Sequence, residues 1–433
     1  MIPPGAAPRP PLAGTVPRAR LAELTDWLSL ASTGDSARWL GAWLAGFGAR
    51  VEHLPTPGGP PVVTGRFDGR RRRPVVLVYG HYDVRPPGPG WTAPPFTPVI
   101  RNGRLYARGA NDDKGQLFAH LAGLAAWRAA GGPPVTVVVI AEGAEEIGSP
   151  GFAAAAVEVR RRIGAVDAIV VSDTERATMD RPAVTVSQRG HLTLRLAVDA
   201  GGPAVHPGRF GGALVDPSLV LARVLLDLER SSRGWLPPAR GPLPVPVTRV
   251  GGAELRRRAG GRATRAGDLD RRVALLPAVT VTGLRAGDGS GGTPGRSLAD
   301  VDIRLPPGVA PEAVAARVRT RLRRLVPVRV RLDAEVTAAH RGEHLVPGPA
   351  LRRAVEFATA AGFGTRPAYV RSGGSIAAVS DLRRVFGVVP LLLGLGTPGG
   401  GAHGPDEHMD VRGWFAAVDT CAALLAAIGG VDR

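Results

Sequence analysis

The sequence is short of several residue types, and each shortage excludes something. It has one cysteine, Cys421, in 433 residues, so no disulfide can form within the chain, and a reducing compartment is expected. Residues 1–17 lack the charged start and apolar core of a signal peptide, and no later apolar run reads as long enough to span a bilayer. We therefore expect a soluble, cytoplasmic protein with no membrane association.

Lysine is almost missing as well. Lys114 is the only one, so the formal net charge of +18 comes from arginine. A basic surface can bind nucleic acid or an acidic partner, but these arginines are dispersed, and the short runs at 70–73 and 256–258 look like loops. Nucleic-acid binding is therefore not expected as the main role.

Short apolar runs that end in polar residues dominate the first half of the chain. Residues 74–79, 135–140 and 168–171 are of this kind, and a helical pattern covers residues 116–130 between the first two. Continuous apolar runs are typical of strands covered on both faces, and strands that alternate with helices indicate an α/β sheet. Before them, residues 18–47 have helical spacing of Leu and Trp, with Asp35 or Ser36 able to cap a second helix.

The pattern changes near residue 190. Alternating leucines, a helix from residue 217, a Pro/Gly/Arg-rich stretch over 231–272, and then strands and helices up to about 348 indicate a compact α+β unit. A buried-strand pattern returns at 388–395. A chain of this length commonly exceeds one core, so we predict an α/β catalytic domain (18–189 and 349–433) with an α+β domain, 190–348, inserted in it.

Five candidate metal ligands follow predicted elements of the α/β domain. Two imidazoles with three carboxylates suit a pair of zinc ions, or manganese or cobalt, in a hydrolytic site where one carboxylate bridges. Neighbouring side chains diverge, so one of Glu145 and Glu146 would coordinate and the other would be the general base. The five ligands are His81, Asp112, Glu146, Asp173 and His403.

A series of motifs resembles the M20 metallopeptidase family, most closely its carnosinase-like cytosolic dipeptidase branch. The likeness runs in order from about residue 20 to the C-terminus. The segments that carry it are 80–86 (GHYDVRP), 90–96 (GWTAPPF), 108–115 (RGANDDKG), 142–149 (EGAEEIGS) and 171–173 (VSD).

The resemblance implies a division of the ligands. Asp112 would bridge two metal ions, with His81 and Asp173 completing one site and Glu146 and His403 the other.

The resemblance also implies roles around the metals. Glu145 would be the general base, Asp83 would orient His81, and the peptide bond between Asp112 and Asp113 would be cis.

The inserted domain resembles the lid and dimerisation domain of the same family. Its segment 205–212 (VHPGRFGG) implies that His206 reaches the partner subunit's site and stabilises the oxyanion, which requires a homodimer. Segment 303–307 implies that Arg304 binds the substrate carboxylate. The loop 372–376 implies contacts from Gly374 and Ser375, and His340 falls where the branch often has a further substrate-facing histidine.

The chain departs from the family pattern around the substrate and not among the metal ligands. Ser372 replaces an acidic residue, Ala377 replaces a proline, Pro207 replaces a serine, and Asp406 stands where asparagine is expected. The segment near Thr293 lacks the usual apolar start of a strand.

Other chemistry-bearing residues have ordinary explanations. Asp113 and Lys114 are expected to build a turn and a helix start. Lone histidines are more often surface or core residues than ligands, and we assign that status to His53, His120, His191, His344 and His408.

The predicted function is hydrolysis of a dipeptide by a metal-bridging hydroxide, with Glu145 as the base. The alternatives are an N-acyl amino acid deacylase or carboxypeptidase, and a biosynthetic M20 relative that acts on a natural-product or carrier-bound amide. A non-catalytic scaffold stabilised by metal is more remote, because a scaffold has no need of a base beside its ligands.

Overall fold

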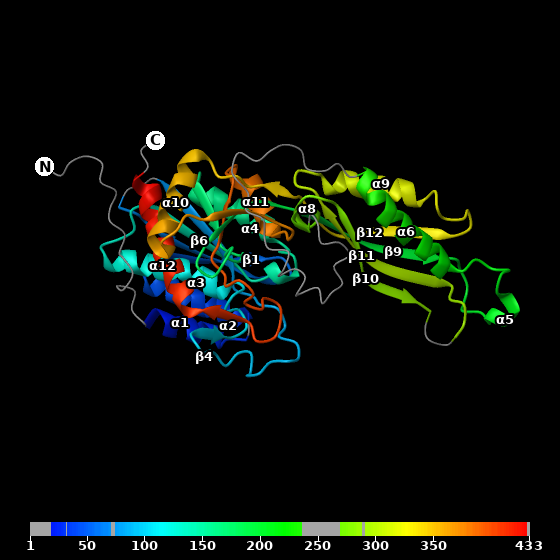
Figure 1. The fold of residues 1–433 in the computed structure, drawn as a ribbon, viewed down its shortest axis with the longest axis horizontal. Coiled ribbons are helices and arrows are strands. Elements are labelled where there is room, and N and C mark those ends of the chain that lie inside the picture. Colours follow the sequence, from blue (N-terminus) through cyan, green and yellow to red (C-terminus); the bar gives the residue numbers. More distant parts are fainter. Residues whose placement is uncertain (1–18, 32, 71–73, 236–268, 288–290, 431–433) are drawn as a thin grey trace.

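The computed structural model describes residues 19–31, 33–70, 74–235, 269–287 and 291–430. Two bodies lie end to end (Figure 1). The predicted Pro/Gly/Arg-rich stretch falls mostly, and the arginine run 256–258 wholly, outside the described residues.

A nine-stranded mixed sheet forms the larger body, in the order β1-β2-β6-β3-β7-β15-β8-β13, with β14 pairing to β8. The central strands β6, β3, β7 and β15 are parallel, as the continuous apolar runs predict. The strands are β1 (Arg50–Thr56), β2 (Gly59–Phe67), β3 (Val75–His81), β6 (Thr136–Glu142), β7 (Ala168–Val171), β8 (Ala183–Gln188), β13 (Glu343–His344), β14 (Ala368–Ser372) and β15 (Leu391–Gly394).

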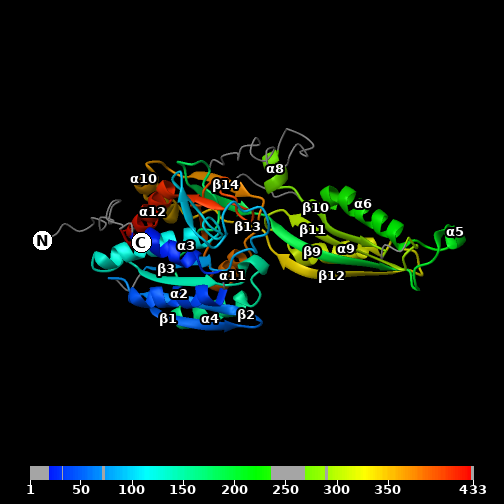
Figure 2. The ribbon, with the colours of Figure 1, turned by 90° about the horizontal axis from the view of Figure 1, so that it is seen from below.

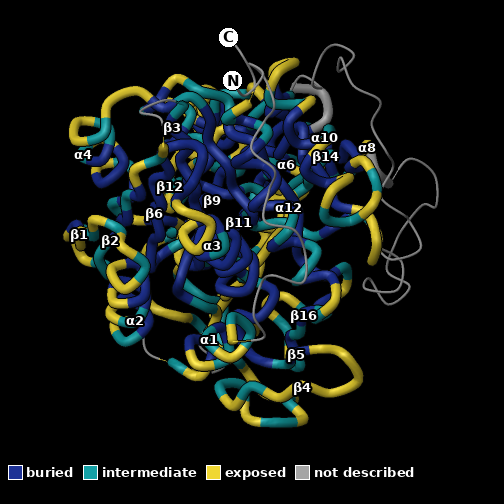
Figure 3. Tube along the Cα trace, turned by 90° about the vertical axis from the view of Figure 1, so that its left-hand side faces the viewer, coloured by how far each residue is buried: buried dark blue, intermediate teal, exposed yellow. Residues whose placement is uncertain are grey.

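Helices cover both faces of this sheet. Alternate residues of β3 enter different cores: Val76 and Val78 pack with α1, α2, α3, α10 and α12, whereas Leu77 and Tyr79 pack with α4 and α11. Figure 3 shows buried segments in the middle of this body and exposed ones around β4. The helices are α1 (Ala19–Leu28), α2 (Thr33–Gly46), α3 (Lys114–Ala129), the 3-10 turn η1 (Glu145–Ile147), α4 (Phe152–Ile163), α10 (Pro349–Phe363), α11 (Ala377–Phe386) and α12 (Val411–Gly430).

A four-stranded antiparallel sheet, in the order β10-β11-β9-β12, forms the smaller body. The alternating leucines 192, 194 and 196 of β9 face α6 and α9, which cover one side of this sheet (Figure 2). Its elements are β9 (Gly190–Asp199), α5 (Pro207–Phe210), α6 (Pro217–Trp235), α8 (Leu269–Ala274), β10 (Ala278–Ala286), β11 (Arg296–Leu305), α9 (Pro311–Leu322) and β12 (Arg331–His340). The mixed α/β architecture is as predicted.

The chain passes between the bodies at two points. Gln188 ends β8 in the large sheet and Gly190 begins β9 in the small one; on the return, β12 ends at His340, and β13 pairs with β8. The insertion bounds 190 and 348 remain a prediction, and the small sheet itself spans residues 190–340.

Two sequence expectations were wrong. Helix α2 begins at Thr33, so Asp35 lies within its first turn and Ser36 is buried; neither stands before the helix as a cap. The 20-residue helix α12 is also long and apolar enough by composition to cross a bilayer, and 72% of its most apolar window is buried inside the protein. This helix packs against α3 and α10 as part of the core, which is why it is so apolar.

Candidate metal centre and substrate site

The predicted ligands converge where the central strands of the large sheet end. His81 is the last residue of β3, Glu146 lies in η1 just after β6, and Asp173 follows β7. Asp112 comes from the loop before α3, and its peptide bond to Asp113 is cis, as the resemblance implied. His403 comes from the loop between β15 and β16 (His408–Asp410).

Asp112 joins these residues into two groups. Its Oδ1 lies 3.2 Å from His81 Nε2, which is also 3.9 Å from Asp173 Oδ1. Its Oδ2 lies 3.0 Å from His403 Nε2, which is also 3.3 Å from Glu146 Oε2. Within each group the candidate ligand atoms lie within 4.8 Å of one another. The two oxygens of one carboxylate therefore face two different sets of ligand atoms.

This donor set fits a pair of divalent ions. Each group offers one imidazole nitrogen and two carboxylates, a combination that suits zinc, manganese or cobalt. The shared carboxylate matches the geometry of paired hydrolytic metals. The groups differ in burial, because the His81 side chain is fully buried while 52% of the His403 side chain is exposed.

The carboxylates give the centre a strong attraction for positive charge. Hydrogen bonds with Asp112 and Glu146 raise the pKa of His403 to about 10. Burial lowers the pKa of His81, but its hydrogen bonds with Asp112 and Asp83 outweigh that effect and raise it overall. A divalent cation bound here would take the place of those protons.

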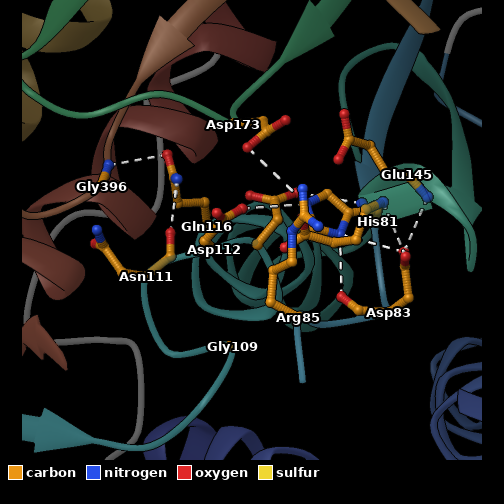
Figure 4. A network of polar contacts seen from close by, with 12 residues as sticks. His81, Asp83, Arg85, Gly109, Asn111, Asp112, Gln116, Glu145, Asp173 and Gly396 are labelled. Carbon is orange, nitrogen blue, oxygen red and sulfur yellow. Dashed lines mark hydrogen bonds and ion pairs between the residues drawn. The ribbon is translucent and has the colours of Figure 1, made fainter. Parts of the chain in front are cut away.

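Asp83 holds His81 from the side opposite Asp112 and Asp173 (Figure 4). Its Oδ1 lies 3.3 Å from His81 Nδ1, and its two carboxylate oxygens accept the backbone N–H groups of Glu145 (3.2 Å) and Glu146 (3.0 Å). One side chain therefore fixes the imidazole and the turn that carries the acidic pair.

Glu145 has the environment of a general base. Its carboxylate is largely buried, and that burial raises its pKa to about 6, with further repulsion from Glu146 and Asp112. A base with a pKa near neutrality can accept a proton and release it again at physiological pH.

Glu407 supports the Asp112 loop, a role that the sequence analysis did not assign to it. Its buried carboxylate accepts hydrogen bonds from Arg108 Nη1 (2.7 Å) and from three backbone N–H groups: Gly109 (3.0 Å), Asn111 (2.8 Å) and Asp112 (2.9 Å). The small sheet of β4 (Val99–Arg101), β5 (Arg104–Tyr106) and β16 brings this residue beside the Asp112 loop. The sequence signal was its position four residues after His403, where Asp406-Glu407 stands in place of the Asn-Glu that the family pattern leads one to expect.

Two of the predicted substrate contacts meet between the bodies. Arg304 Nη1 lies 3.2 Å from Ser375 Oγ, and Asp302 holds the same guanidinium through Nε (2.8 Å). Gly374 is exposed in the same loop, and its backbone N–H donates a hydrogen bond to Ser372 Oγ (3.0 Å).

His340 lies next to His191, which we had expected from the sequence to be a surface or core residue and not part of a site. Their rings stack with centroids 5.4 Å apart. His191 on β9 is the register partner of both Arg304 on β11 and His340 on β12, so the three form a row across the face of the small sheet that α6 and α9 leave open. Burial and the charge of Arg304 lower the pKa of His191 to about 4, so it is neutral above that pH.

His206 lies far from this centre within one chain. It is exposed at the start of α5, at the outer tip of the smaller body (Figures 1 and 2), and its Nδ1 accepts the N–H of Gly208 at 3.1 Å. Its contribution to a partner subunit's site remains a prediction.

The substitution at Asp406 has a local explanation. Its carboxylate oxygens accept the backbone N–H (2.8 Å) and the hydroxyl (2.5 Å) of Thr92, which ties the His403 loop to residues 90–96. Three of the ordinary assignments hold locally: Asp113 and Lys114 build the turn and first residue of α3, and His120 is a buried core residue hydrogen-bonded to Ser172 Oγ.

Comparison with known proteins points to one group of enzymes. The sequence profile of the peptidase family M20/M25/M40 matches residues 77–428. The Cys-Gly metallodipeptidase DUG1 of Candida albicans is 28% identical over 395 residues, which cover 84% of this chain and 81% of that protein. The human Beta-Ala-His dipeptidase is 28% identical over 440 residues, covering 94% and 85% respectively.

A solved structure has the same fold. The di-peptidase Dug1p from Saccharomyces cerevisiae superposes with a TM-score of 0.81 at 23% identity, over 96% of this chain and 97% of that one. The likeness therefore includes the small body as well as the large one.

Proposed function

The chain belongs to the peptidase family M20/M25/M40 and is a metallodipeptidase-type hydrolase. We propose that it cleaves dipeptides at a centre of two metal ions bridged by Asp112. The observation that carries the proposal is the position of the two Asp112 oxygens, one in each ligand group. His81 and Asp173 would hold one ion, and Glu146 and His403 would hold the other. Zinc is the proposed metal, with manganese or cobalt as substitutes.

The side chains around the centre have different proposed roles in amide hydrolysis. When bound, the two ions supply a Lewis acid for the substrate carbonyl and lower the pKa of a water molecule. Glu145 takes the proton from that water, since its raised pKa suits a base, and passes it to the leaving amine. Asp83 keeps His81 and the Glu145 turn in place while the proton moves.

Arg304 and the Ser375 loop receive the other end of the substrate. A guanidinium already oriented by Asp302 is suited to a free carboxylate, which dipeptides and N-acyl amino acids both carry. His340 and Gly374 complete this end of the site. The relatives' names give Cys-Gly and Beta-Ala-His as substrates of those proteins, so we propose a small unblocked dipeptide here.

The active unit is proposed to be a homodimer. His206 is too far from the centre of its own chain to act there, so it would stabilise the oxyanion in a partner subunit, and residues 190–348 would act as a lid and dimerisation domain between the two catalytic segments, 18–189 and 349–433. A cytoplasmic location suits the single buried cysteine, Cys421.

A substrate panel tests this proposal. The chain loaded with zinc or manganese would be assayed on dipeptides, on the same dipeptides with an amidated C-terminus, and on N-acetyl amino acids. Cleavage of free dipeptides that is lost in Glu145→Ala supports the dipeptidase. Cleavage of the acetylated amino acids alone would instead identify a deacylase, and no cleavage of any free-carboxylate substrate would contradict the proposal.

A further inference from the structure

Arg85 places a positive charge directly against the more exposed ligand group. It lies four residues after His81, and its side chain extends toward Asp112 and the His81 ring (Figure 4). Its Nε is 2.8 Å from Glu146 Oε2, the same oxygen that lies 3.3 Å from His403 Nε2. One carboxylate oxygen is therefore shared between a guanidinium and a candidate metal site.

The two ligand groups differ in what surrounds them. In the His81 group, the His81 side chain is fully buried and that of Asp173 is 11% exposed. In the His403 group, the side chain of His403 is 52% exposed, and that of Arg85 beside it is 47% exposed. The added cation thus lies at the open group and not at the closed one.

We propose that Arg85 competes with the metal ion for Glu146 and makes the Asp112–Glu146–His403 site the weaker of the two, so that its ion exchanges while the ion at the His81 group stays bound. The proposal rests on the proposed two-metal function. It assigns Arg85 to control of metal occupancy, a role separate from the base and from the residues that bind the substrate.

The charges support this direction. Both groups have two carboxylates and one imidazole, so their affinities would be similar if ligand charge alone decided them. Arg85 cancels one negative charge at the His403 group only. An ion bound to Glu146 Oε2 at about 2 Å would lie roughly 4–5 Å from the guanidinium, and even in bulk water a +2 and a +1 charge at that separation repel enough to weaken binding about tenfold.

Calorimetric titration of the metal-free chain with Mn²⁺ tests the proposal, using Arg85→Gln, Arg85→Lys and, as a matched control, Arg161→Gln. The side chain of Arg161 on α4 is 75% exposed and forms an ion pair with Glu158, so its loss changes the net charge equally but away from the centre. In the unmodified chain we expect one tight and one weak ion. In Arg85→Gln the weak dissociation constant falls about tenfold and the tight one by less than about threefold.

The other variants and the salt dependence complete the test. Arg85→Lys keeps the charge and should keep the weak site within about threefold of the original, and Arg161→Gln should leave both constants unchanged. The gain in Arg85→Gln should shrink in high salt, because the guanidinium is half exposed.

Three outcomes would overturn the proposal. If Arg85→Gln leaves the dissociation constant of the weaker site unchanged or raises it, Arg85 positions Glu146 and does not compete for it, while the two-metal function stands. If Arg161→Gln has the same effect, the cause is overall charge. If every variant binds a single ion, the proposal and the two-metal function both fail.

Discussion

Replacement of Glu407 by glutamine should destabilise the protein by about 5 kcal/mol at pH 8. The buried carboxylate accepts hydrogen bonds from four N–H groups, two at each oxygen. A glutamine amide has one oxygen that can accept, and its NH₂ group would face two N–H donors without being able to accept from them. Two unsatisfied buried donors cost about 1–3 kcal/mol each. Arg108, whose side chain is 1% exposed, also loses its counter-charge, and breaking a buried pair in this way costs about 3–5 kcal/mol. These costs overlap, which gives the figure of about 5.

The neighbouring residue supplies a matched control. Asp406→Asn removes the same charge one position earlier, but the Asp406 carboxylate accepts its hydrogen bonds from the exposed Thr92, so the change should cost less than about 1 kcal/mol. Burial raises the pKa of Glu407 to about 7, against the effect of its N–H donors, so the assay is run at pH 8, where the carboxylate is ionised.

The assay is scanning calorimetry of the metal-free proteins. Glu407→Gln should lower the midpoint of the large body's transition by roughly 10 °C, and the added change Arg108→Gln should recover part of that loss because it removes the orphaned charge. Equal shifts for Asp406→Asn and Glu407→Gln, or a shift of less than about 2 °C for the latter, would refute the reasoning.

Three further outcomes are expected. Lys114 Nζ donates to Ser36 Oγ (2.8 Å) and to two backbone carbonyls in a buried site. Lys114→Arg and Lys114→Met should therefore both lower the free energy of unfolding in urea by about 3 kcal/mol. An unchanged urea midpoint for the arginine variant would show that a positive charge alone is enough to stabilise this site. Burial lowers the pKa of His120 to about 4 from 6.5, so as pH falls the unfolded chain binds a proton that the folded chain refuses, and up to about 3 kcal/mol of stability is lost between pH 6.5 and 4. His120→Gln should flatten that part of the stability–pH curve, and an unaltered curve would contradict the assignment. Arg304→Ala should raise KM for a free dipeptide at least about tenfold and leave an amidated one nearly unchanged; equal effects on both would remove Arg304 from carboxylate binding.

The sequence predicted what depends on local pattern. Apolar runs that end at His81 and Asp173 predicted parallel strands, and parallel strands bring their carboxyl ends to one edge, so these side chains were expected to meet. The alternating leucines of residues 190–199 helped to predict a compact α+β unit, and these leucines lie on the face of the small sheet that α6 and α9 cover.

What the sequence did not predict depends on register and long-range contact. His191 lies in a row with Arg304 and His340 because β9 pairs with both β11 and β12, and no pattern within 190–199 specifies those partners. Glu407 lies 295 positions from the Asp112 N–H that it accepts, so its role needed the fold. No role for Arg85 was expected from the sequence, because its contact with Glu146 depends on where η1 lies in the fold.

The central claim is that Asp112 bridges two metal ions. The most direct test is a crystal of the chain grown with Mn²⁺ or Zn²⁺ and measured for anomalous scattering from that metal. Two peaks are expected about 3.5–4 Å apart, one beside each oxygen of Asp112, with His81 and Asp173 at the first and Glu146 and His403 at the second. A single peak, or two peaks that do not share Asp112, would contradict it.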